Sequence, residues 1–323
     1  MNRQLRIVYM GTPEFAVAPL KAILDAGFDV AAVVTAPDKP AGRGRNLRQS
    51  AVKEFAVANK LPVLQPLFLK DPVFIEELRS FHANLHVVVA FRMLPEVVWG
   101  MPALGTFNLH ASLLPQYRGA APINWAIING ETKTGLTTFF LTHEIDTGNI
   151  LFQEEMRVEP EDTAGSLHDR LSSAGSLLVL KTLESIGANA YVLQKQADMI
   201  QPGAELKPAP KIFKSDCILD WNQPALAIHN RVRGLSPVPG AVTTLVSPVG
   251  TAYSLKIFRT SIEKNEEKSP VCRDISTDRK NNMSVQCRDD KIMIHDLQLE
   301  GKKRLSVSEF LRGFPMEGSW KMK

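Results

Sequence analysis

The chain has 323 residues, of which 44% are hydrophobic and 22% are charged. Because a single hydrophobic core usually stops growing below this length, the sequence predicts two domains of an ordinary globular protein. The three cysteines are far apart and lack Cys-x-x-Cys spacing, which argues against a disulfide framework and against a zinc site. The amino-terminal apolar run is short and broken by Gly11 and Pro13, so we expect no signal peptide, no membrane span and a cytoplasmic protein.

The net charge of +4 is unevenly distributed. Residues 1–200 carry 18 basic and 20 acidic side chains, whereas residues 201–323 carry 20 basic and 14 acidic ones. A basic C-terminal third indicates a polyanionic partner, most simply nucleic acid, and a solvated lysine-rich surface is the alternative.

The predicted elements open as strand, helix and strand. The strands cover residues 6–10 and 29–35, and the helix between them covers 13–26 and ends at Gly27. This order is typical of a doubly wound parallel sheet. The first turn has only Gly11 where a dinucleotide site needs Gly-x-Gly-x-x-Gly, which argues against a nicotinamide enzyme.

A basic segment follows at residues 36–49. Its prolines and glycines predict a projecting loop without regular structure. It carries four cations: Lys39, Arg43, Arg45 and Arg48. Such side chains suit phosphate contacts, and a solvated surface loop is the alternative.

The remaining pattern continues the sheet and then changes character. We predict strands at 61–65, 85–91, 107–113, 137–142 and 151–158, and helices that begin at Ser50, Asp71, Pro122 and Thr163. Short alternating runs at 241–246, 252–260 and 291–299 are typical of a small antiparallel barrel or sandwich, and the charged stretch 263–282 predicts a mobile hairpin excursion within that domain. The expected fold is therefore a Rossmann-like doubly wound α/β sheet followed by a small β-barrel of the oligonucleotide-binding kind. The expected domains are residues 1–190 and 210–319, with a linker at 191–209.

A candidate reaction centre lies in the strand near residue 110. Asn108 and His110 are two residues apart in an alternating run, so their side chains share one face, and the strand then runs into a turn at Leu114-Pro115. Asp146 follows the next strand and is a plausible third member of the site. The alternatives are a solvated strand face and an aspartate that hydrogen-bonds its own turn.

Four motifs together resemble a known family. They are VYMGTPEFA at 8–16, PDKPAGRGR at 37–45, NLHASLLPQYRGAAP at 108–122 and IDTGNIL at 145–151. Over essentially the whole length, the chain resembles the methionyl-tRNA formyltransferase family, one of the folate-dependent formyl transferases. The wider family shares Asn-x-His and the later aspartate, whereas the basic loop and the C-terminal domain indicate a tRNA acceptor.

The resemblance implies transfer of the formyl group of 10-formyltetrahydrofolate to the α-amino group of methionine on initiator tRNA. Attack of the amine creates an oxyanion and a protonated nitrogen, so the site needs hydrogen-bond donors and a proton acceptor. Asn108 and His110 can supply the donors, and Asp146 can orient His110 and accept the proton. No metal or membrane is required, and the protein is expected to act as a monomer.

The resemblance also implies binding residues. The folate contacts fall on Val89, Phe91, Leu94, Ser112, Leu113, Leu114, Pro115, Thr142 and Ile145. The tRNA contacts fall on Lys39, Arg43, Arg45 and Arg48 in the basic loop and on Lys207, Lys211, Arg231 and Arg233 near or in the barrel. The chain departs from the family pattern at Arg92, which stands where a glycine is expected, so Arg92 is left without a role.

Two other classes of function compete with this hypothesis. One is a formyl transferase acting on a sugar nucleotide or glycinamide ribonucleotide, or a formyltetrahydrofolate hydrolase; a small acceptor would not explain the basic loop and the C-terminal domain. The other is a non-catalytic RNA-binding protein, against which the intact Asn108, His110 and Asp146 argue.

Overall fold

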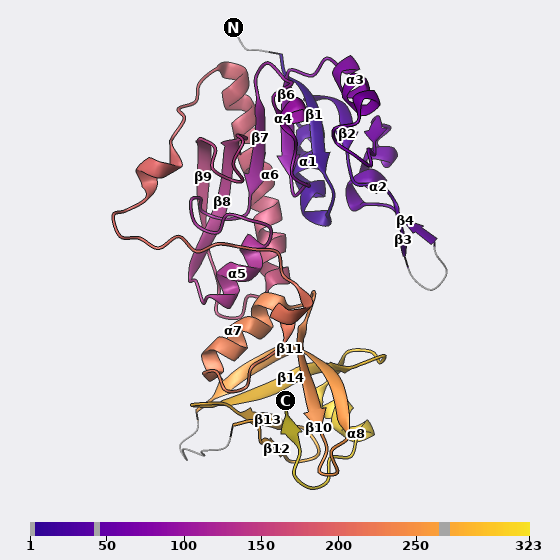
Figure 1. Ribbon diagram of the computed structural model, residues 1–323, viewed down its shortest axis with the longest axis vertical. Coiled ribbons are helices and arrows are strands. Elements are labelled where there is room, and N and C mark those ends of the chain that lie inside the picture. Colours follow the sequence, from indigo (N-terminus) through magenta and orange to yellow (C-terminus); the bar gives the residue numbers. More distant parts are fainter. Residues whose placement is uncertain (1–3, 42–45, 265–271) are drawn as a thin grey trace. The chain divides into compact units, whose positions relative to one another are not determined.

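The structure is a computed structural model that describes residues 4–41, 46–264 and 272–323 (Figure 1). Its described residues form two compact units. The first contains the chain up to Gly119, Thr134–Arg157 and His168–Pro208. The second contains Ala120–Lys133, Val158–Leu167 and the chain from Ala209 onward. Two segments therefore group with the C-terminal unit although they precede it in the sequence.

The first unit is built on a seven-stranded sheet with the strand order β5-β2-β1-β6-β7-β8-β9. Its strands are β1 (Arg6–Gly11), β2 (Asp29–Val34), β5 (Val63–Leu64), β6 (Leu85–Val89), β7 (Thr106–His110), β8 (Lys133–Phe140) and β9 (Ile150–Arg157). The strands from β5 to β7 pair in parallel, whereas β8 runs antiparallel to β7. The predicted α/β class is confirmed, with the parallel part ending at β7.

Helices cover the sheet of the first unit. They are η1 (Glu14–Ala16), α1 (Val17–Asp25), α2 (Ala51–Ala58), α3 (Pro72–Ser80), α4 (Glu96–Trp99), α6 (Ala164–Ala188) and η2 (Gln196–Met199). The helix predicted at 13–26 is thus two pieces. The N-caps predicted at Ser50, Asp71 and Thr163 are confirmed: their side-chain oxygens accept from the backbone N–H groups of Lys53 at 3.0 Å, Val73 at 2.9 Å and Ser166 at 3.2 Å respectively. The helical piece that begins at Glu14 has no side-chain cap.

The two faces of this sheet meet different helices. On one face, Val88 belongs to a cluster with Leu78 of α3 and Val98 of α4. On the other, Leu109 is so close to α6 that a side chain at Gly175 would meet it at 2.8 Å. Because strand side chains alternate and Asn108 pairs with Val88, the even-numbered residues of β7 face the side of α3 and α4.

The basic segment forms a small hairpin. β3 (Lys39–Ala41) and β4 (Asn46–Arg48) pair antiparallel, with Lys39 opposite Arg48. The expectation of a segment without regular structure is therefore wrong for its two arms, because a few residues on each side are enough to pair across a connecting tip. The predicted tRNA residues Arg43 and Arg45 lie outside the described residues.

The second unit contains an antiparallel barrel with the strand order β12-β13-β14-β11-β10-β16, and β15 pairs with β14. Its strands are β10 (Ala241–Val246), β11 (Ala252–Glu263), β12 (Ile275–Thr277), β13 (Met283–Gln286), β14 (Lys291–Leu299), β15 (Leu305–Ser306) and β16 (Lys321–Met322). The Ile275 N–H donates to the Trp320 carbonyl at 3.2 Å and the Met322 N–H to the Arg273 carbonyl at 2.9 Å, so the two edge strands nearly close the barrel. The predicted barrel is confirmed. In the stretch 263–282, predicted as a mobile hairpin excursion, β12 pairs antiparallel with β13 and so belongs to the sheet.

Four helices accompany the barrel in the second unit: α5 (Pro122–Ile128), η3 (Lys214–Cys217), α7 (Ala225–Leu235) and α8 (Val307–Gly313). Trp221 is fully buried in the core of this unit and donates its indole N–H to the Thr243 hydroxyl at 2.8 Å. The three cysteines are all free, as predicted. Within the described ranges, no helix combines the length and the apolar character that crossing a membrane requires.

Candidate active site

His110 ends β7 at the carboxyl edge of the parallel strands, the edge where α/β sheets usually bind ligands. Its side chain is buried, with the ring packed edge-on against Phe139. Asn108 lies two residues earlier on the same face and is half-buried. Within the part of the chain that the structure describes, its side-chain amide makes no hydrogen bond. The expected shared face is therefore present, with one amide free to bind a ligand.

Asp146 reaches His110 from an unexpected direction. Because β8 is antiparallel to β7, its last residue, Phe140, lies beside Phe107, at the opposite end of β7 from His110. The loop at 141–149 then returns about 10 Å along the strand, a distance that corresponds to about three residues. The Asp146 carboxylate ends 3.9 Å from His110 Nδ1. The three predicted catalytic residues thus lie on one face, two on the strand and one on a loop.

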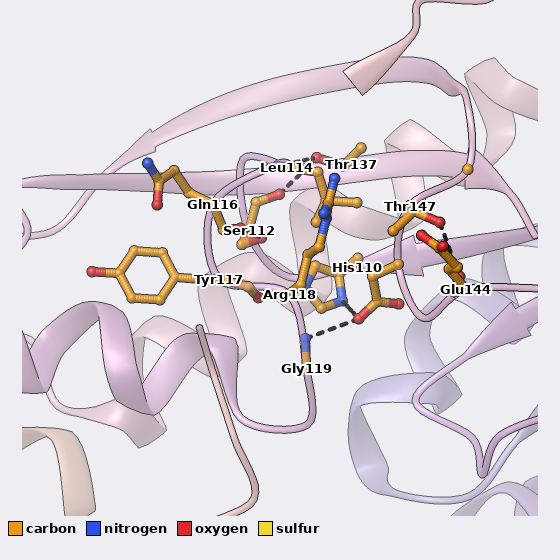
Figure 2. Close-up of polar contacts among 12 residues, drawn as sticks. His110, Ser112, Leu114, Gln116, Tyr117, Arg118, Gly119, Thr137, Glu144 and Thr147 are labelled. Atoms are coloured by element: carbon orange, nitrogen blue, oxygen red, sulfur yellow. Dashed lines mark hydrogen bonds and ion pairs between the residues drawn. The ribbon is translucent and has the colours of Figure 1, made fainter. Parts of the chain in front are cut away.

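The turn after β7 determines which nitrogen of His110 carries a proton. His110 Nε2 lies 2.9 Å from the Tyr117 carbonyl, which can only accept a hydrogen bond. Nε2 therefore carries a proton, and in the neutral tautomer the lone pair is on Nδ1, which faces Asp146. Figure 2 shows His110 and the Gly119 nitrogen facing the same carboxylate, whereas the Tyr117 ring points away. The Gly119 N–H donates to this carboxylate at 2.9 Å.

A hydroxyl on β8 holds this turn. Thr137 donates to the Ser112 carbonyl at 2.7 Å and accepts from the Leu114 N–H at 3.1 Å and the Gln153 amide at 3.0 Å. The Ser112 hydroxyl in turn donates to the Gln116 carbonyl at 2.6 Å. The chain can therefore place the Tyr117 carbonyl against His110, although Tyr117 has a left-handed φ of 59°.

Two residues that the sequence did not indicate as site residues join the turn to the Asp146 loop. Gln196 lies in the segment predicted to be a linker, yet it is buried and donates to the backbone carbonyls of Asp146 and Gly148. It also accepts from the Arg118 guanidinium. A glutamine in a polar, proline-containing stretch carries no periodic or motif signal, so only the tertiary contacts reveal it.

The residues predicted to contact folate differ in exposure. Val89, Ser112, Leu114 and Pro115 are buried. Leu94 is also buried and lines a shallow depression that includes none of the three predicted catalytic residues. The remaining four are partly or largely exposed: Phe91, Leu113, Thr142 and Ile145.

Arg92, the departure from the family pattern, is tied down by its own loop contacts. Its guanidinium donates to the carbonyls of Leu67, at 2.9 Å, and Pro66, and it lies 5.5 Å from the Phe91 ring centre. Burial lowers the pKa of this guanidinium below its ordinary value. The side chain is therefore a brace between two loops.

The residues predicted to contact tRNA fall into two groups. The exposed ones are Lys39, Arg48, Lys207 and Lys211. Arg231 and Arg233 on α7 are half-buried, and their guanidinium groups donate to the carbonyls of Asp216 and Asp162 respectively. Burial also lowers the pKa of Arg233. The α7 arginines are thus hydrogen-bonded inside the second unit.

Residues 4–41, 46–264 and 272–323 contain no cluster of three or more His, Cys, Asp or Glu side chains arranged to hold a metal ion. The described site consists of amide, imidazole, carboxylate and backbone groups. These groups suit a reaction that develops an oxyanion and releases a proton.

Comparison with known proteins agrees with this fold. The formyl transferase family model matches residues 5–183, and the formyl transferase C-terminal domain model matches residues 211–315. The chain belongs to the formyl transferase family.

Within this family, the chain is similar over nearly its full length to proteins named methionyl-tRNA formyltransferase. It is 53% identical to that of Parabacteroides distasonis over 314 residues, 97% of each chain. It is 51% identical to that of Bacteroides thetaiotaomicron over 321 residues, 99% of each chain. Among solved structures, a sugar 3N-formyl transferase crystallised in the presence of dTDP and 5-N-formyl-THF has the same fold, with a TM-score of 0.62 at 21% identity over 93% of this chain and 100% of that one.

Proposed function

We propose that this protein transfers the formyl group of 10-formyltetrahydrofolate to the α-amino group of methionyl-initiator tRNA. The observation that carries the proposal is the similarity, above 50% identity and over almost the full length, to proteins named for this activity. The juxtaposition of Asn108, His110 and Asp146 supports the chemistry.

Asn108 is the donor for the developing oxyanion in this proposal. Its amide N–H groups can only donate, and no other described residue uses them. Strand pairing on both sides fixes the backbone of Asn108, so the half-buried amide extends from a rigid strand, and a donor on a rigid element needs little reorganisation to bind negative charge.

His110 and Asp146 act as a pair that takes up the proton of the attacking amine. The neutral ring offers a lone pair only at Nδ1, because Nε2–H is bound to the Tyr117 carbonyl. A proton added at Nδ1 would face the Asp146 carboxylate 3.9 Å away, which stabilises the imidazolium. His110 can then donate from Nδ1 at the moment when the oxyanion or the departing nitrogen needs a proton.

The residues around the carboxyl ends of β6 and β7 fit a flat heteroaromatic ligand. Phe91, Leu113 and Ile145 present partly exposed apolar surface near buried backbone groups. When bound, 10-formyltetrahydrofolate supplies a formyl group on a nitrogen that can leave. The chain's own residues orient this group and manage the proton.

The tRNA side of the proposal rests on charge and on the relatives. The basic hairpin carries the exposed Lys39 and Arg48, and the chain from residue 201 onward has a net positive charge. Cationic side chains on a projecting hairpin and on a barrel suit phosphate contacts. In this proposal the protein acts as a monomer in the cytoplasm, where charged initiator tRNA is used.

The test is formation of formyl-methionyl-tRNA from 10-formyltetrahydrofolate and charged initiator tRNA. Removing one oxyanion donor typically costs about 2.7 to 4 kcal/mol, so Asn108→Ala and His110→Ala should each lower kcat by about 10²- to 10³-fold. Asn59→Ala is the matched control, because Asn59 is exposed beyond α2 and its amide bonds only a local carbonyl. Near-normal turnover in both site variants, or release of formate without formyl-methionine, would contradict the proposal.

A further inference from the structure

Gln196 is a buried polar side chain in an otherwise exposed stretch. It begins η2, its side chain is 3% exposed, and both of its neighbours, Lys195 and Ala197, are exposed. Burying an amide is unfavourable unless its polar atoms are hydrogen-bonded. The burial of this one residue therefore needs a reason in its contacts.

All of the hydrogen-bonding capacity of the Gln196 amide is used. Its nitrogen donates to the carbonyls of Asp146, at 2.8 Å, and Gly148, at 2.9 Å. Its oxygen accepts from Arg118 Nε at 3.1 Å and from Arg118 Nη2 at 2.6 Å. Backbone carbonyls only accept and a guanidinium only donates, so one orientation of the amide satisfies all four bonds.

The loop that Gln196 holds is the one that has to return to His110. Its residues from Thr142 to Ile145 are exposed, and Asp146 has a left-handed φ of 55°. For a non-glycine residue this conformation is strained and persists only when the surroundings impose it. Two bonds to the carbonyls at 146 and 148 impose it from the backbone side.

The two site loops are thereby joined in two ways. Gly119 N–H of the turn after β7 binds the side chain of Asp146 at 2.9 Å. Arg118, the preceding residue, binds the backbone around Asp146 through Gln196. The carboxylate and the peptide group of the same aspartate are therefore fixed by consecutive residues of one turn.

We infer that Gln196 is a positioning residue for formyl transfer, an inference that rests on the proposed function. It holds the Asp146 loop and Arg118 in one arrangement and so sets the Asp146 carboxylate against His110 Nδ1. Gln196 itself touches no reacting atom. Its loss acts on the chemical step through the placement of Asp146.

The test measures steady-state formyl transfer by the full chain carrying Gln196→Met, which keeps the length of the side chain and removes all four hydrogen bonds. Misplacing a catalytic group by about 1 Å can cost about 10²-fold, so we expect kcat to fall by about 10- to 100-fold. The KM for folate and the KM for tRNA should each change by less than about threefold, because the lost interaction acts in the transition state.

Gln286→Met is the matched control. Gln286 is also buried, and its amide nitrogen donates to the carbonyls of Cys287 and Asp290 in the second unit. Gln286→Met should lower the unfolding temperature about as much as Gln196→Met does, but it should leave kcat near the wild-type value. If both variants lose kcat in proportion to their loss of stability, Gln196 is only structural and the inference fails.

Gln196→Glu supplies a readout that a purely structural role would not move. The carboxylate keeps an acceptor for Arg118 but sets negative oxygen against two carbonyls, whereas the protonated acid can again donate to one of them. The kcat of this variant relative to wild type should therefore rise as the pH is lowered, and a ratio that is flat with pH would count against the inference. If the wild type transfers the formyl group and Gln196→Met has the same kcat, only the inference is overturned. If the wild type does not transfer the formyl group, the proposed function is overturned as well.

Discussion

His86 should make the stability of the first unit fall in mild acid. The side chain lies in the central strand β6 and is 1% exposed. Its Nδ1 atom has no hydrogen-bond partner among the described residues, and the ring has one hydrogen bond to the backbone of Val98. Burial lowers the pKa of His86 from 6.5 to about 4, and the Val98 hydrogen bond opposes this only in part.

The magnitude follows from the two pKa values. Folded His86 remains neutral down to about pH 4, whereas the unfolded chain binds a proton below about pH 6.5. The unfolded state therefore holds more protons in this window, so stability is lost as the pH falls through it. At 1.36 kcal/mol per pKa unit, the full loss is about 3 kcal/mol, of which about 2 kcal/mol should appear between pH 7 and pH 5.

The assay compares wild type with His86→Gln, in which an amide that can form hydrogen bonds but does not titrate replaces the imidazole. Hydrogen exchange of peptides from β1 and β6, corrected for intrinsic rates at each pH, reports the opening free energy of this unit separately from the barrel. The separation matters because burial also lowers the pKa of His229, in the second unit, to about 4. If wild type and His86→Gln lose the same opening free energy between pH 7 and pH 5, the predicted role of His86 is refuted.

Two further predictions concern the Asp146 loop and the basic segment. Gly148→Ala should lower kcat by about 10²-fold, because a Cβ there would lie 1.7 Å from the Phe140 carbonyl oxygen and displace the Asp146 loop. The control is Gly313→Ala, where no atom beyond the chain neighbours and the helix's own backbone lies within 4 Å of the added carbon, and unchanged kinetics of Gly148→Ala would contradict the predicted displacement. Arg43→Ala should weaken the use of tRNA while leaving folate affinity nearly unchanged. The exposed Arg79→Ala serves as its control, and equal loss of both substrates would indicate misfolding instead.

Local signals predicted the parts of this fold that local chemistry determines. Ser50 and Asp71 begin their helices because a side-chain oxygen there satisfies an N–H that the helix leaves unpaired. Asn108 and His110 share a face because strand side chains alternate. In each case, the interaction partners lie within a few residues along the chain.

The features that the sequence did not predict depend on distant partners. Alternation is the same in both strand directions, so it could not reveal that β8 runs antiparallel to β7. The basic hairpin pairs across a tip, which composition does not record. The Tyr117 carbonyl that selects the tautomer of His110 is a backbone group, and residue type says nothing of where it points. Gln196 acts through contacts 48 to 78 residues away in the sequence.

The reversed direction of β8 has a consequence for how the protein is made. Asp146 lies on a loop that runs back along the sheet, and Gln196 holds this loop. Gln196 comes after all seven strands of that sheet and after α6 in chain order. During synthesis, the strands and the aspartate therefore leave the ribosome before the residue that holds them in register with the histidine. In this view, the first unit acquires its shape before it acquires its chemistry.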